Sequence, residues 1–533
     1  MVSGHQRDPN DLKQVAKAHQ LTKAGYGPPQ PDVFRPAEKE GQNVVSNRRA
    51  NEEVDTLVIG GGPAGLTGAL HLQGLDADRV PVVIEAGDRV GGIARTESHR
   101  GYRFDIGGHR FFTKVPEVKA FWEDLMGDDF IDVPRSSRIY YRGCFFDYPL
   151  RVGNALGNLG LLESFRSGLS WMKWRMLPVR NEQNFEEWVC NRFGGRLYWH
   201  FFRTYTEKVW GIPGTEIQAD WAAQRIKDLS LFKAVVDAVF KRGESTSLIK
   251  SFKYPRLGPG QLWERAADRV ESQGGEVRLE TAATAVHHDG ERVLAVELES
   301  RNGDRRRVTP RSVLSSMPLT QLVRAMNPPA PPEVLEACDG LRYRDFLIVT
   351  LVLDHADPFP DNWIYIHEPN VTVGRIQNFR AWSKEMVPDD STASIGMEYF
   401  CHEGDGLWDS DDETLIELAS KELAELGLAP ASSVIDGKVI RQKKAYPVYD
   451  AGYQDRVETI RQWLEGFKNL ETSGRNGMHR YNNQDHSMVS AMVAAERLID
   501  PVNGGDPWSV NVERSYQEEF RVKPRVEERV VDA

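Results

Sequence analysis

The hydrophobic and polar positions of the chain change their spacing several times, and each change predicts a different kind of element. Val54–Ile59 is a β-branched apolar run that passes into three glycines and then into apolar residues at helical spacing. This pattern predicts a strand, a tight turn and a helix. From about residue 115 to 245 apolar residues recur at intervals of three and four, for example at Leu197, Phe201 and Tyr205. That spacing predicts an inserted helical block.

The second half of the chain returns to strand-like patterns before a last helix. Residues 276–318 predict short strands separated by turns, and residues 346–400 predict the antiparallel strands of a second sheet. Residues 482–500 begin with capping side chains and continue as an amphipathic helix. Because Rossmann-like elements occur at both ends, we expect an α/β fold whose nucleotide-binding domain is assembled from discontinuous segments.

These patterns divide the chain into five expected parts. They are a flexible N-terminal extension (1–52), a discontinuous nucleotide-binding domain (53–114, 250–320 and 470–510), a mainly helical domain (115–249), a mainly antiparallel-sheet substrate domain (321–469) and a C-terminal tail (511–533). The extension is polar and contains several prolines, so no packed element is expected in it.

Composition and charge exclude several classes of function. Of the 533 residues 40% are hydrophobic, enough for large cores, and the net charge of -11 disfavours nucleic acid as a partner. The four cysteines show no metal-type spacing, so we expect free, buried thiols in a reducing compartment and no metal site. The N-terminus lacks the apolar region of a secretory signal, and no run of about 18 apolar residues predicts a membrane span. We therefore expect a soluble, cytoplasmic protein without a membrane partner.

The glycine turn carries the fingerprint of a dinucleotide site. Gly60, Gly62 and Gly65 fit the spacing G-x-G-x-x-G between a predicted strand and a predicted helix. Glu85 ends a second strand twenty residues after Gly65. In this context the glycines allow a pyrophosphate to approach, the helix N-terminus favours its charge, and the carboxylate binds ribose hydroxyls.

A second glycine pair brings in a resemblance to known flavoproteins. Gly91 and Gly92, just beyond Glu85, are similar to the second glycine motif of the FAD-binding, glutathione-reductase-like superfamily, which includes amine oxidases and phytoene desaturases. The resemblance implies FAD as the dinucleotide and a Rossmann-like domain of the glutathione-reductase type. In that superfamily a helix like the one predicted near residue 484 points its positive end at the N1–C2=O edge of the flavin, which favours the anionic reduced form.

Six short blocks, in order, make the resemblance more specific. RFDIGGHRFF, RIYY with DYPLR, FEEW with FFRTYTEKVWGIP, WIYIHEPNVTVGRIQNF, AYP and GRNGMHRYNNQDHS follow the order seen in UDP-galactopyranose mutases, closest to the eukaryotic type. The resemblance implies that Gly108 lets the backbone press on the flavin ring, that His109 covers it, and that arginines hold the diphosphate of a nucleotide sugar.

The resemblance and the fingerprint together give the expected site. The catalytic residues are His109, Arg203 and Arg375; the substrate-binding residues are Tyr148, Arg151, Trp188, Arg203, Tyr365, Arg375, Tyr446 and Tyr481; the cofactor-binding residues are Gly60, Gly62, Pro63, Ala64, Gly65, Glu85, Gly91, Gly92, Gly108, His109, Arg475, Asn483 and Gln484.

Some assignments have ordinary alternatives, and two features depart from the family. Arg203 lies four residues before Glu207, so it has the spacing of a solvated ion pair on a helix. The tyrosines have the alternative of being core residues with a satisfied hydroxyl. Arg151 stands where the eukaryotic-type enzymes have glutamine, and the loop Leu257–Gln261 is shorter and less glycine-rich than theirs. These departures leave the base and the sugar of the substrate open.

The resemblance implies a mutase that interconverts pyranose and furanose forms. In the family, N5 of the reduced flavin attacks the anomeric carbon of the sugar and the nucleoside diphosphate leaves. Guanidinium groups and hydroxyls suit such a dianionic leaving group. Two other interpretations stay open: an FAD oxidoreductase resembling amine oxidase or protoporphyrinogen oxidase, and a flavin-binding protein without catalysis. The sequence also leaves open NAD(P)H as a transient reductant and assembly into a homo-oligomer.

Overall fold

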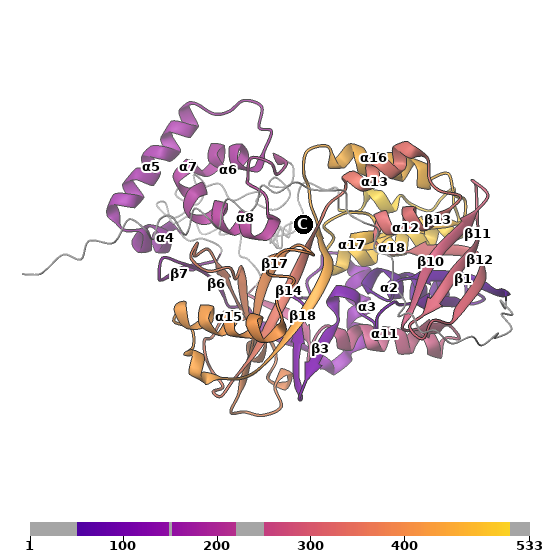
Figure 1. The fold of residues 1–533 in the computed structure, drawn as a ribbon, viewed down its shortest axis with the longest axis horizontal. Helices are drawn as coiled ribbons and strands as arrows, with labels where there is room; N and C mark the ends of the chain where they lie inside the picture. Colours follow the sequence, from indigo (N-terminus) through magenta and orange to yellow (C-terminus); the bar gives the residue numbers. More distant parts are fainter. Residues whose placement is uncertain (1–50, 149–151, 220–249, 512–533) are drawn as a thin grey trace, which may run out of the picture. The chain divides into compact units, whose positions relative to one another are not determined.

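The strand predicted before the glycine turn lies inside an eight-stranded sheet. The computed structural model describes residues 51–148, 152–219 and 250–511, which belong to the larger of two compact units, residues 49–533 (Figure 1). In it β1 (Asn51–Ile59) pairs in parallel with β2 (Pro81–Ile84) on one side and with β12 (Arg305–Ser315) on the other. β9 (Glu276–Arg278) continues the parallel order beyond β2. This is the strand arrangement of a Rossmann-like domain.

β12 has two different partners along its length on the side away from β1. Its first half pairs antiparallel with β11 (Val293–Ser300), and its last residues pair in parallel with β19 (Leu470–Thr472). β10 (Thr281–His288) and β13 (Met326–Asn327) extend the antiparallel branch. The carboxyl ends of β1, β2, β12 and β19 therefore lie in register at one edge of the sheet, which is where ligands bind in open α/β sheets.

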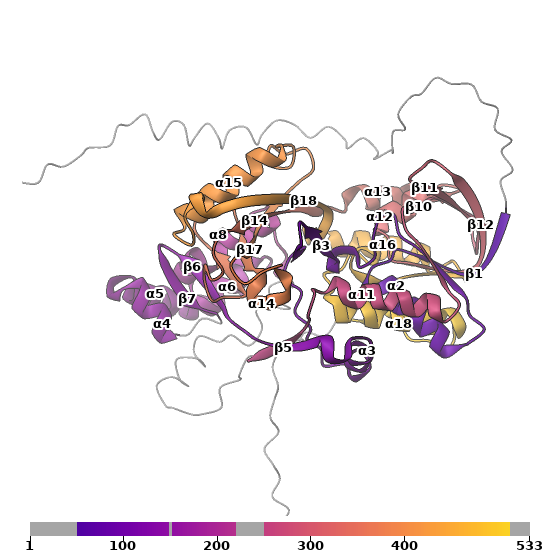
Figure 2. The same ribbon diagram turned by 90° about the horizontal axis from the view of Figure 1, so that it is seen from below.

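Helices cover both faces of this sheet (Figure 2). One face carries α2 (Pro63–Leu75), α3 (Pro116–Met126), α11 (Gly260–Ser272) and α18 (Gln484–Ile499). The other carries α12 (Leu319–Ala325), α13 (Pro332–Gly340) and α16 (Tyr453–Leu464). The sequence placed these last three helices mostly in the substrate domain, but their apolar sides pack on Leu57 and Val313 of the nucleotide-binding sheet.

A second sheet of seven strands is mainly antiparallel, as the sequence predicts. Its order is β18 (Val434–Pro447), β14 (Tyr343–Leu353), β17 (Ala393–Cys401), β16 (Arg375–Asn378), β15 (Trp363–Ile366), β6 (Ser137–Tyr141) and β7 (Cys144–Asp147). Of these pairs only β15 with β6 is parallel. One face packs on α15 (Asp412–Glu425) around Leu347, Ile376 and Tyr399.

The helical block packs against the opposite face of the seven-stranded sheet. It comprises α4 (Val152–Leu159), α5 (Leu161–Met176), α6 (Phe185–Phe193), α7 (Gly195–Leu197), the π-helical turn η4 (Tyr198–Arg203) and α8 (Thr204–Trp210). α8 ends at Gly211, whose φ of 67° lies in the left-handed region that suits glycine at a helix end.

The segment predicted as helical is interrupted by strands. Besides β6 and β7 it contains β5 (Phe130–Pro134), which pairs antiparallel with β8 (Ser251–Pro255). The remaining short elements are β3 (Thr96–His99), β4 (Tyr102–Asp105), α14 (Phe379–Trp382), α17 (Gly474–Gly477), η2 (Gly92–Ala94), η3 (Gly127–Asp129), η5 (Lys384–Met386), η6 (Ala431–Ser433) and η7 (Pro507–Ser509).

The structure also bears on two expectations drawn from composition. The four cysteines are free, and Cys190, Cys338 and Cys401 are buried whereas Cys144 is partly exposed. Across the described ranges we find no helix with both the length and the apolar character needed to cross a bilayer.

The expected N-terminal extension and the C-terminal tail lie outside the described residues, except that Asn51 and Glu52 already pair with β12 and Asn511 ends the described chain.

Candidate active site

The glycine fingerprint is built so closely that side chains are excluded from it. Gly60 has a φ of 106°, and a Cβ on Gly65 would lie 1.8 Å from the carbonyl oxygen of Gly60. α2 begins directly after, with Pro63 in its first turn. The Glu85 carboxylate accepts hydrogen bonds of 2.8 Å from the amides of Gly61 and Gly87. The turn therefore presents backbone at the positive end of a helix, with a carboxylate beside it.

The second glycine pair lies directly against the first. The Gly91 amide donates to the Gly61 carbonyl at 2.8 Å, and a Cβ on Gly92 would lie 3.3 Å from the Cα of Gly62. Gly91 also adopts a φ of 103°. Close approach of a phosphate-bearing ligand to two backbone segments requires such bare turns. The residues present therefore fit a bound dinucleotide.

The C-terminal segment reaches the same turn. A Cβ on Gly474 would lie 2.9 Å from the Cβ of Ala64, so α17 sits on the start of α2. The Arg475 guanidinium donates from Nε to the Asn482 carbonyl at 2.9 Å and from Nη1 to the Ala445 carbonyl at 3.1 Å. These bonds hold the Arg475 side chain, which belongs to α17, against the end of β18.

The last predicted cofactor residues form the start of α18. The Asn483 amide donates to Nδ1 of His486 at 3.4 Å, and the Gln484 side chain accepts from Nε1 of Trp263 at 3.0 Å. α18 packs along α2, so the structure brings the three predicted cofactor segments together. Their contact with FAD remains a prediction.

The motif RFDIGGHRFF places its glycine pair against β16. A Cβ on Gly107 would lie 3.5 Å from Nη2 of Arg375, and a Cβ on Gly108 would lie 3.5 Å from the side-chain amide of Gln377. Arg375 and Gln377 are two residues apart on one strand, so they share a face. Gly108 is exposed although Gly107 is buried. The glycine pair thus forms a bare backbone surface next to the Arg375 guanidinium.

His109 is neutral in this environment. Burial lowers the pKa of His109 to about 3, and the nearby guanidinium groups of Arg475 and Arg375 act in the same direction. A neutral imidazole can donate one hydrogen bond and accept another. His109 therefore contributes no positive charge, and the charged groups that act on it are two guanidiniums.

Asp105, two residues before the glycine pair, is a fully buried carboxyl group. Tyr254 donates to its Oδ2 at 2.5 Å and Thr96 donates to its Oδ1 at 3.3 Å. Burial raises the pKa of Asp105 to about 8, although both hydrogen bonds act to lower it. Thr96 also accepts from the Gly260 amide at 2.9 Å. Through Thr96, Asp105 thereby connects the segment before Gly107 and Gly108 to the loop Leu257–Gln261.

We expect the stability of the protein to report the protonation of Asp105. Between pH 5 and 8 the folded state keeps a proton that the unfolded chain, with a pKa of 3.8, has released. The free energy of unfolding should therefore fall as pH rises, by at most about 1.4 kcal/mol per pH unit from this group. Asp105→Asn removes that contribution, so its stability relative to the wild type should increase with pH in urea titrations. Asp390→Asn, whose carboxylate is 94% exposed, is the control. A pH-independent difference for Asp105→Asn would show that Asp105 is ionised in the folded protein.

Arg375 is the centre of a polar row across the second sheet. Tyr365 on β15 and Glu398 on β17 lie opposite it in the strand register. The Arg375 guanidinium contacts Oε2 of Glu398 at 2.6 Å, and the Glu398 side chain is completely buried. Gln377 donates to the other carboxylate oxygen. Burial alone would lower the pKa of Arg375, but the Glu398 carboxylate keeps it well above its usual value. Arg375 therefore stays charged.

Several tyrosines lie near this guanidinium, and Tyr205 and Tyr446 act on it electrostatically. Tyr446 and Tyr481 are stacked with ring centroids 5.6 Å apart, and Arg475 lies 4.8 Å above the Tyr481 ring. Burial raises the pKa of Tyr446, and the charges of Arg375 and Glu398 also act on it. Tyr205 packs edge-on against Tyr365 at 5.4 Å. The predicted residues His109, Arg375, Arg475, Tyr365, Tyr446 and Tyr481 thus form one cluster.

Other predicted substrate residues lie at its border or away from it. The Tyr148 ring is 40% exposed and contacts the Tyr365 ring at 4.8 Å, so it lies at the rim. Trp188 is 5% exposed in the core of the helical block, with the Arg192 guanidinium 3.9 Å over its ring. Arg151 lies outside the described residues.

Arg203 has different surroundings from Arg375. Its Nε donates to Glu207 at 2.9 Å, and its guanidinium lies 3.9 Å over the ring of Trp199. Both partners are four residues away on the same helical segment, and the Arg203 side chain is 36% exposed. Tyr205, which faces Arg375, is two residues further on and so points to another side of the helix. The ion pair weighed as the alternative is thus present, and contact of Arg203 with a substrate remains a prediction.

These contacts predict a small effect for Arg203→Ala. Loss of the partly exposed ion pair between Arg203 and Glu207 should change the free energy of unfolding by about 0.5 kcal/mol or less. We expect turnover of the nucleotide sugar that the resemblance implies to fall much less than in Arg375→Ala, measured in parallel. Glu207→Gln, which removes the same pair from the other side, is the matched control. If Arg203→Ala loses as much turnover as Arg375→Ala while Glu207→Gln loses none, Arg203 contacts the diphosphate of the substrate.

Sequence reasoning missed three residues of the cluster: Tyr205, Gln377 and Glu398. Glu398 had a visible signal, because it is the one charged residue in the apolar strand ASIGMEYFC. A carboxylate inside such a strand needs a charged partner. Tyr205 was noted only for its helical spacing. Gln377 lies two residues after Arg375 and carried no separate signal.

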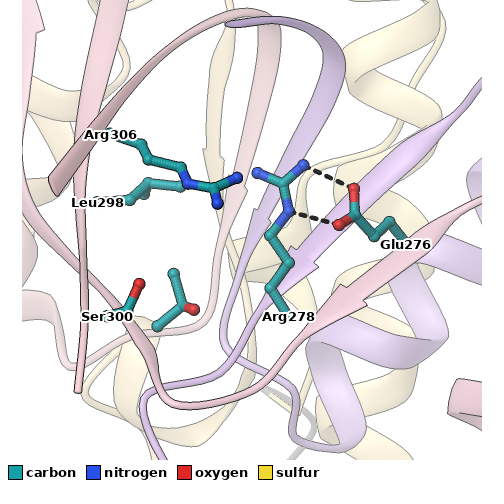
Figure 3. Close-up of a pocket in the computed structure, with 6 residues that line it drawn as sticks. Glu276, Arg278, Leu298, Ser300 and Arg306 are labelled. Carbon is teal, nitrogen blue, oxygen red and sulfur yellow. Dashed lines mark hydrogen bonds and ion pairs between the residues drawn. The ribbon is translucent and has the colours of Figure 1, made fainter. Parts of the chain in front are cut away.

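A hollow of about 210 Å³ on the eight-stranded sheet is lined by none of the predicted residues (Figure 3). Its walls are Glu276, Arg278, Thr281, Leu298, Ser300 and Arg306. Figure 3 shows Arg278 bound by Glu276, and Glu52 binds the same guanidinium. Since two carboxylates already neutralise Arg278, we assign this hollow no role in the site.

The family of the chain follows from comparison with known proteins. The sequence profile described as flavin containing amine oxidoreductase matches residues 63–448. The chain therefore belongs to the flavin-containing amine oxidoreductase family. Membership implies a flavin cofactor, in agreement with the expected FAD, whereas NAD(P)H gains no support.

Solved structures share the fold at low sequence identity. A reduced UDP-galactopyranose mutase matches with a TM-score of 0.74 and 21% identity, over 85% of this chain and 96% of that one. A putative protoporphyrinogen oxidase from Exiguobacterium sp. 255-15 matches with a TM-score of 0.63 and 17% identity, over 85% and 99%. A putrescine oxidase matches with a TM-score of 0.57 and 16% identity, over 84% and 100%. These likenesses confirm the α/β FAD-binding fold.

Curated relatives match only a short segment. Coproporphyrinogen III oxidase of Mycobacterium leprae is 41% identical over 69 residues, 13% of this chain and 15% of that protein. The corresponding enzyme of Mycobacterium tuberculosis is 39% identical over the same length. The chain thus matches less than a sixth of the length of these relatives.

Proposed function

We propose that the protein is a flavin-dependent mutase that interconverts the pyranose and furanose forms of a nucleotide sugar. The observation that carries the proposal is the clustering of Arg375 and Arg475 with Tyr365, Tyr446 and Tyr481 beside Gly107 and Gly108. A diphosphate leaving group needs charge-assisted hydrogen bonds from such groups. The fold likeness to the reduced UDP-galactopyranose mutase supports the same proposal.

The charge of the cluster disfavours a cationic amine as substrate. Glu398 is its buried carboxylate, and it is occupied by Arg375 and Gln377. His109 is neutral because burial and two guanidiniums hold its pKa at about 3. The positive charges of Arg375 and Arg475 would repel an ammonium group, and the Glu398 carboxylate is not free to balance that charge. The same charges would attract a diphosphate.

Each residue then has a defined task. Glu398 and Gln377 orient the Arg375 guanidinium and leave its remaining N–H groups for phosphate oxygens. The hydroxyls of Tyr365, Tyr446 and Tyr481 donate hydrogen bonds to the same diphosphate. When bound in reduced form, FAD would supply the electron-rich nitrogen that attacks the anomeric carbon while the nucleoside diphosphate departs. Gly107 and Gly108 keep the backbone face beside Arg375 free of side chains.

The test is product analysis with the reduced holoprotein. Dithionite-reduced protein should convert at least one of a panel of nucleotide sugars to its other ring form, detected by anion-exchange chromatography, without net oxidation. Oxidised protein should be inactive. Stoichiometric oxygen consumption with an amine or a porphyrinogen, together with no ring interconversion, would instead assign the chain to the oxidases of its family.

A further inference from the structure

Helix α5 turns a side of polar and tryptophan residues inward and a side of other apolar residues outward. On the inner side Glu163 accepts from Arg196 at 2.7 Å and contacts Nε2 of His200 at 2.9 Å. Ser167 is 3% exposed, and Ser170 accepts from the Arg196 amide at 3.2 Å. Figure 1 shows α6 and α7 along this side of the helix, and both pack on α5. Folding of the block thus uses the inner face of α5, where Trp174 also packs on the core of the block.

The outer face of α5 is a continuous apolar ridge. Its members are large apolar side chains that are exposed: Leu161 (92%), Leu162 (65%), Phe165 (66%), Leu169 (46%), Met172 (45%) and Met176 (74%). At 3.6 residues per turn these positions fall within an arc of roughly 100°. Contiguous exposed apolar side chains of this kind mark an interaction surface.

Cations border the ridge on both sides. Arg166 and Lys173 follow one edge of the arc and Arg175 follows the other, by the same helical geometry. Lys173 and Arg175 are exposed, and neither forms an ion pair with a described residue. The Arg166 guanidinium lies 3.9 Å from Glu163, which Arg196 already binds. In a chain of net charge -11 this helix is a local basic surface.

We propose that α5 docks the protein on an anionic lipid surface, with the apolar ridge in the interface and the bordering cations on lipid headgroups. A helix with an apolar face between rows of Lys and Arg has the composition of interfacial helices. The cations favour this occupant over a second copy of the chain, because a twofold contact of two ridges would place the bordering cations of one copy along those of the other. Sequence alone led us to expect no membrane partner, since the outward orientation of the ridge is visible only in the structure.

The charge and the ridge make separable contributions to binding. Each Lys or Arg near an anionic surface adds about fivefold to partitioning, and this part weakens with salt. Lys173→Gln with Arg175→Gln should therefore lower partitioning about thirtyfold. Phe165→Asp with Leu169→Asp removes the centre of the ridge and should abolish binding in any salt.

The experiment is sedimentation of the full-length holoprotein with phosphatidylcholine vesicles that contain or lack about 30% phosphatidylglycerol, an anionic share chosen to give a negative surface potential. We expect binding to the anionic vesicles alone, about thirtyfold weaker in Lys173→Gln with Arg175→Gln and lost in Phe165→Asp with Leu169→Asp. Binding should be kept in Val502→Asp, which alters an apolar residue that is 87% exposed elsewhere. Circular dichroism and flavin content show that each variant is folded.

Two results would overturn the proposal. Equal binding to both vesicle types, or no binding to either, would show that the ridge does not select anionic lipid. A dimer in size-exclusion chromatography that Phe165→Asp with Leu169→Asp dissociates would identify a second copy as the occupant. Neither result bears on the mutase proposal, which rests on other residues.

Discussion

Arg375→Ala is expected to slow ring interconversion by about two to three orders of magnitude, the usual loss when one preorganised donor to a developing negative charge is removed. Arg375 is held at its position by a 2.6 Å contact with the buried Glu398, and its tip reaches the bare backbone at Gly107. The loss should lie in kcat, because the charge on the diphosphate increases as the bond to the sugar breaks. Single-turnover kinetics of the reduced protein would measure it.

The variant needs a control for folding, since it leaves the Glu398 carboxylate buried without its cation. Removing one partner of a buried ion pair costs about 3–5 kcal/mol. The double variant Arg375→Ala with Glu398→Gln removes both charges and should recover part of that stability without recovering turnover. Arg375→Lys keeps the charge but not the planar fork, and should be intermediate in rate. Near wild-type turnover in folded Arg375→Ala would exclude Arg375 from the site.

The parts of the fold that sequence predicts well are those with strong local signals. β1, the glycine turn and α2 lie where a β-branched run, G-x-G-x-x-G and a helical pattern place them. α18 begins at Gln484, within two residues of the predicted start. The glycine turn and the two helices are determined by nearby sequence. β1 pairs with the distant β12, but it also carries a β-branched apolar run, so the local pattern and the tertiary fold agree.

The parts that sequence misses depend on distant partners. β6 and β7 lie within the segment predicted as helical. They form a local hairpin, and β6 joins it to the second sheet by pairing with β15, more than 220 residues later. In the same way, α12, α13 and α16 pack on the nucleotide-binding sheet although they lie in the segment assigned to the other domain. No local spacing encodes which sheet an amphipathic helix will cover.

The candidate site shows the same division. Gly65 lies in a turn with no room for a side chain, as the fingerprint predicts, whereas contact of Gly108 with a flavin stays a prediction. Arg203 and Arg375 were both expected to hold the substrate, but of the two Arg375 has a buried carboxylate across its strand, whereas Arg203 pairs along its own helix. Charged side chains become distinguishable only when their three-dimensional partners are known, because burial decides whether a pair is structural or solvated.

Gly65→Ala is expected to abolish stable flavin binding. The new Cβ would lie 1.8 Å from the Gly60 carbonyl oxygen, and because this atom is backbone the whole turn must shift. A displacement of about 1 Å at a positioning element costs about a hundredfold, so we expect FAD affinity to fall by at least that factor. Purified Gly65→Ala should be colourless, and titration of the apoprotein with FAD by flavin fluorescence would give the affinity.

Gly74→Ala is the matched control because it lies on the same helix, and a Cβ added there would meet no atom within 4 Å. Alanine is favoured over glycine in a helix by about 0.5–1 kcal/mol, so this variant should be slightly more stable and should bind FAD normally. Urea unfolding of the two apoproteins separates lost stability from lost affinity. If Gly65→Ala retains wild-type FAD affinity, the turn between β1 and α2 does not hold the pyrophosphate. The FAD-binding role of Gly60, Gly62 and Gly65 would then have to be abandoned even though the fold around them is of the FAD-binding type.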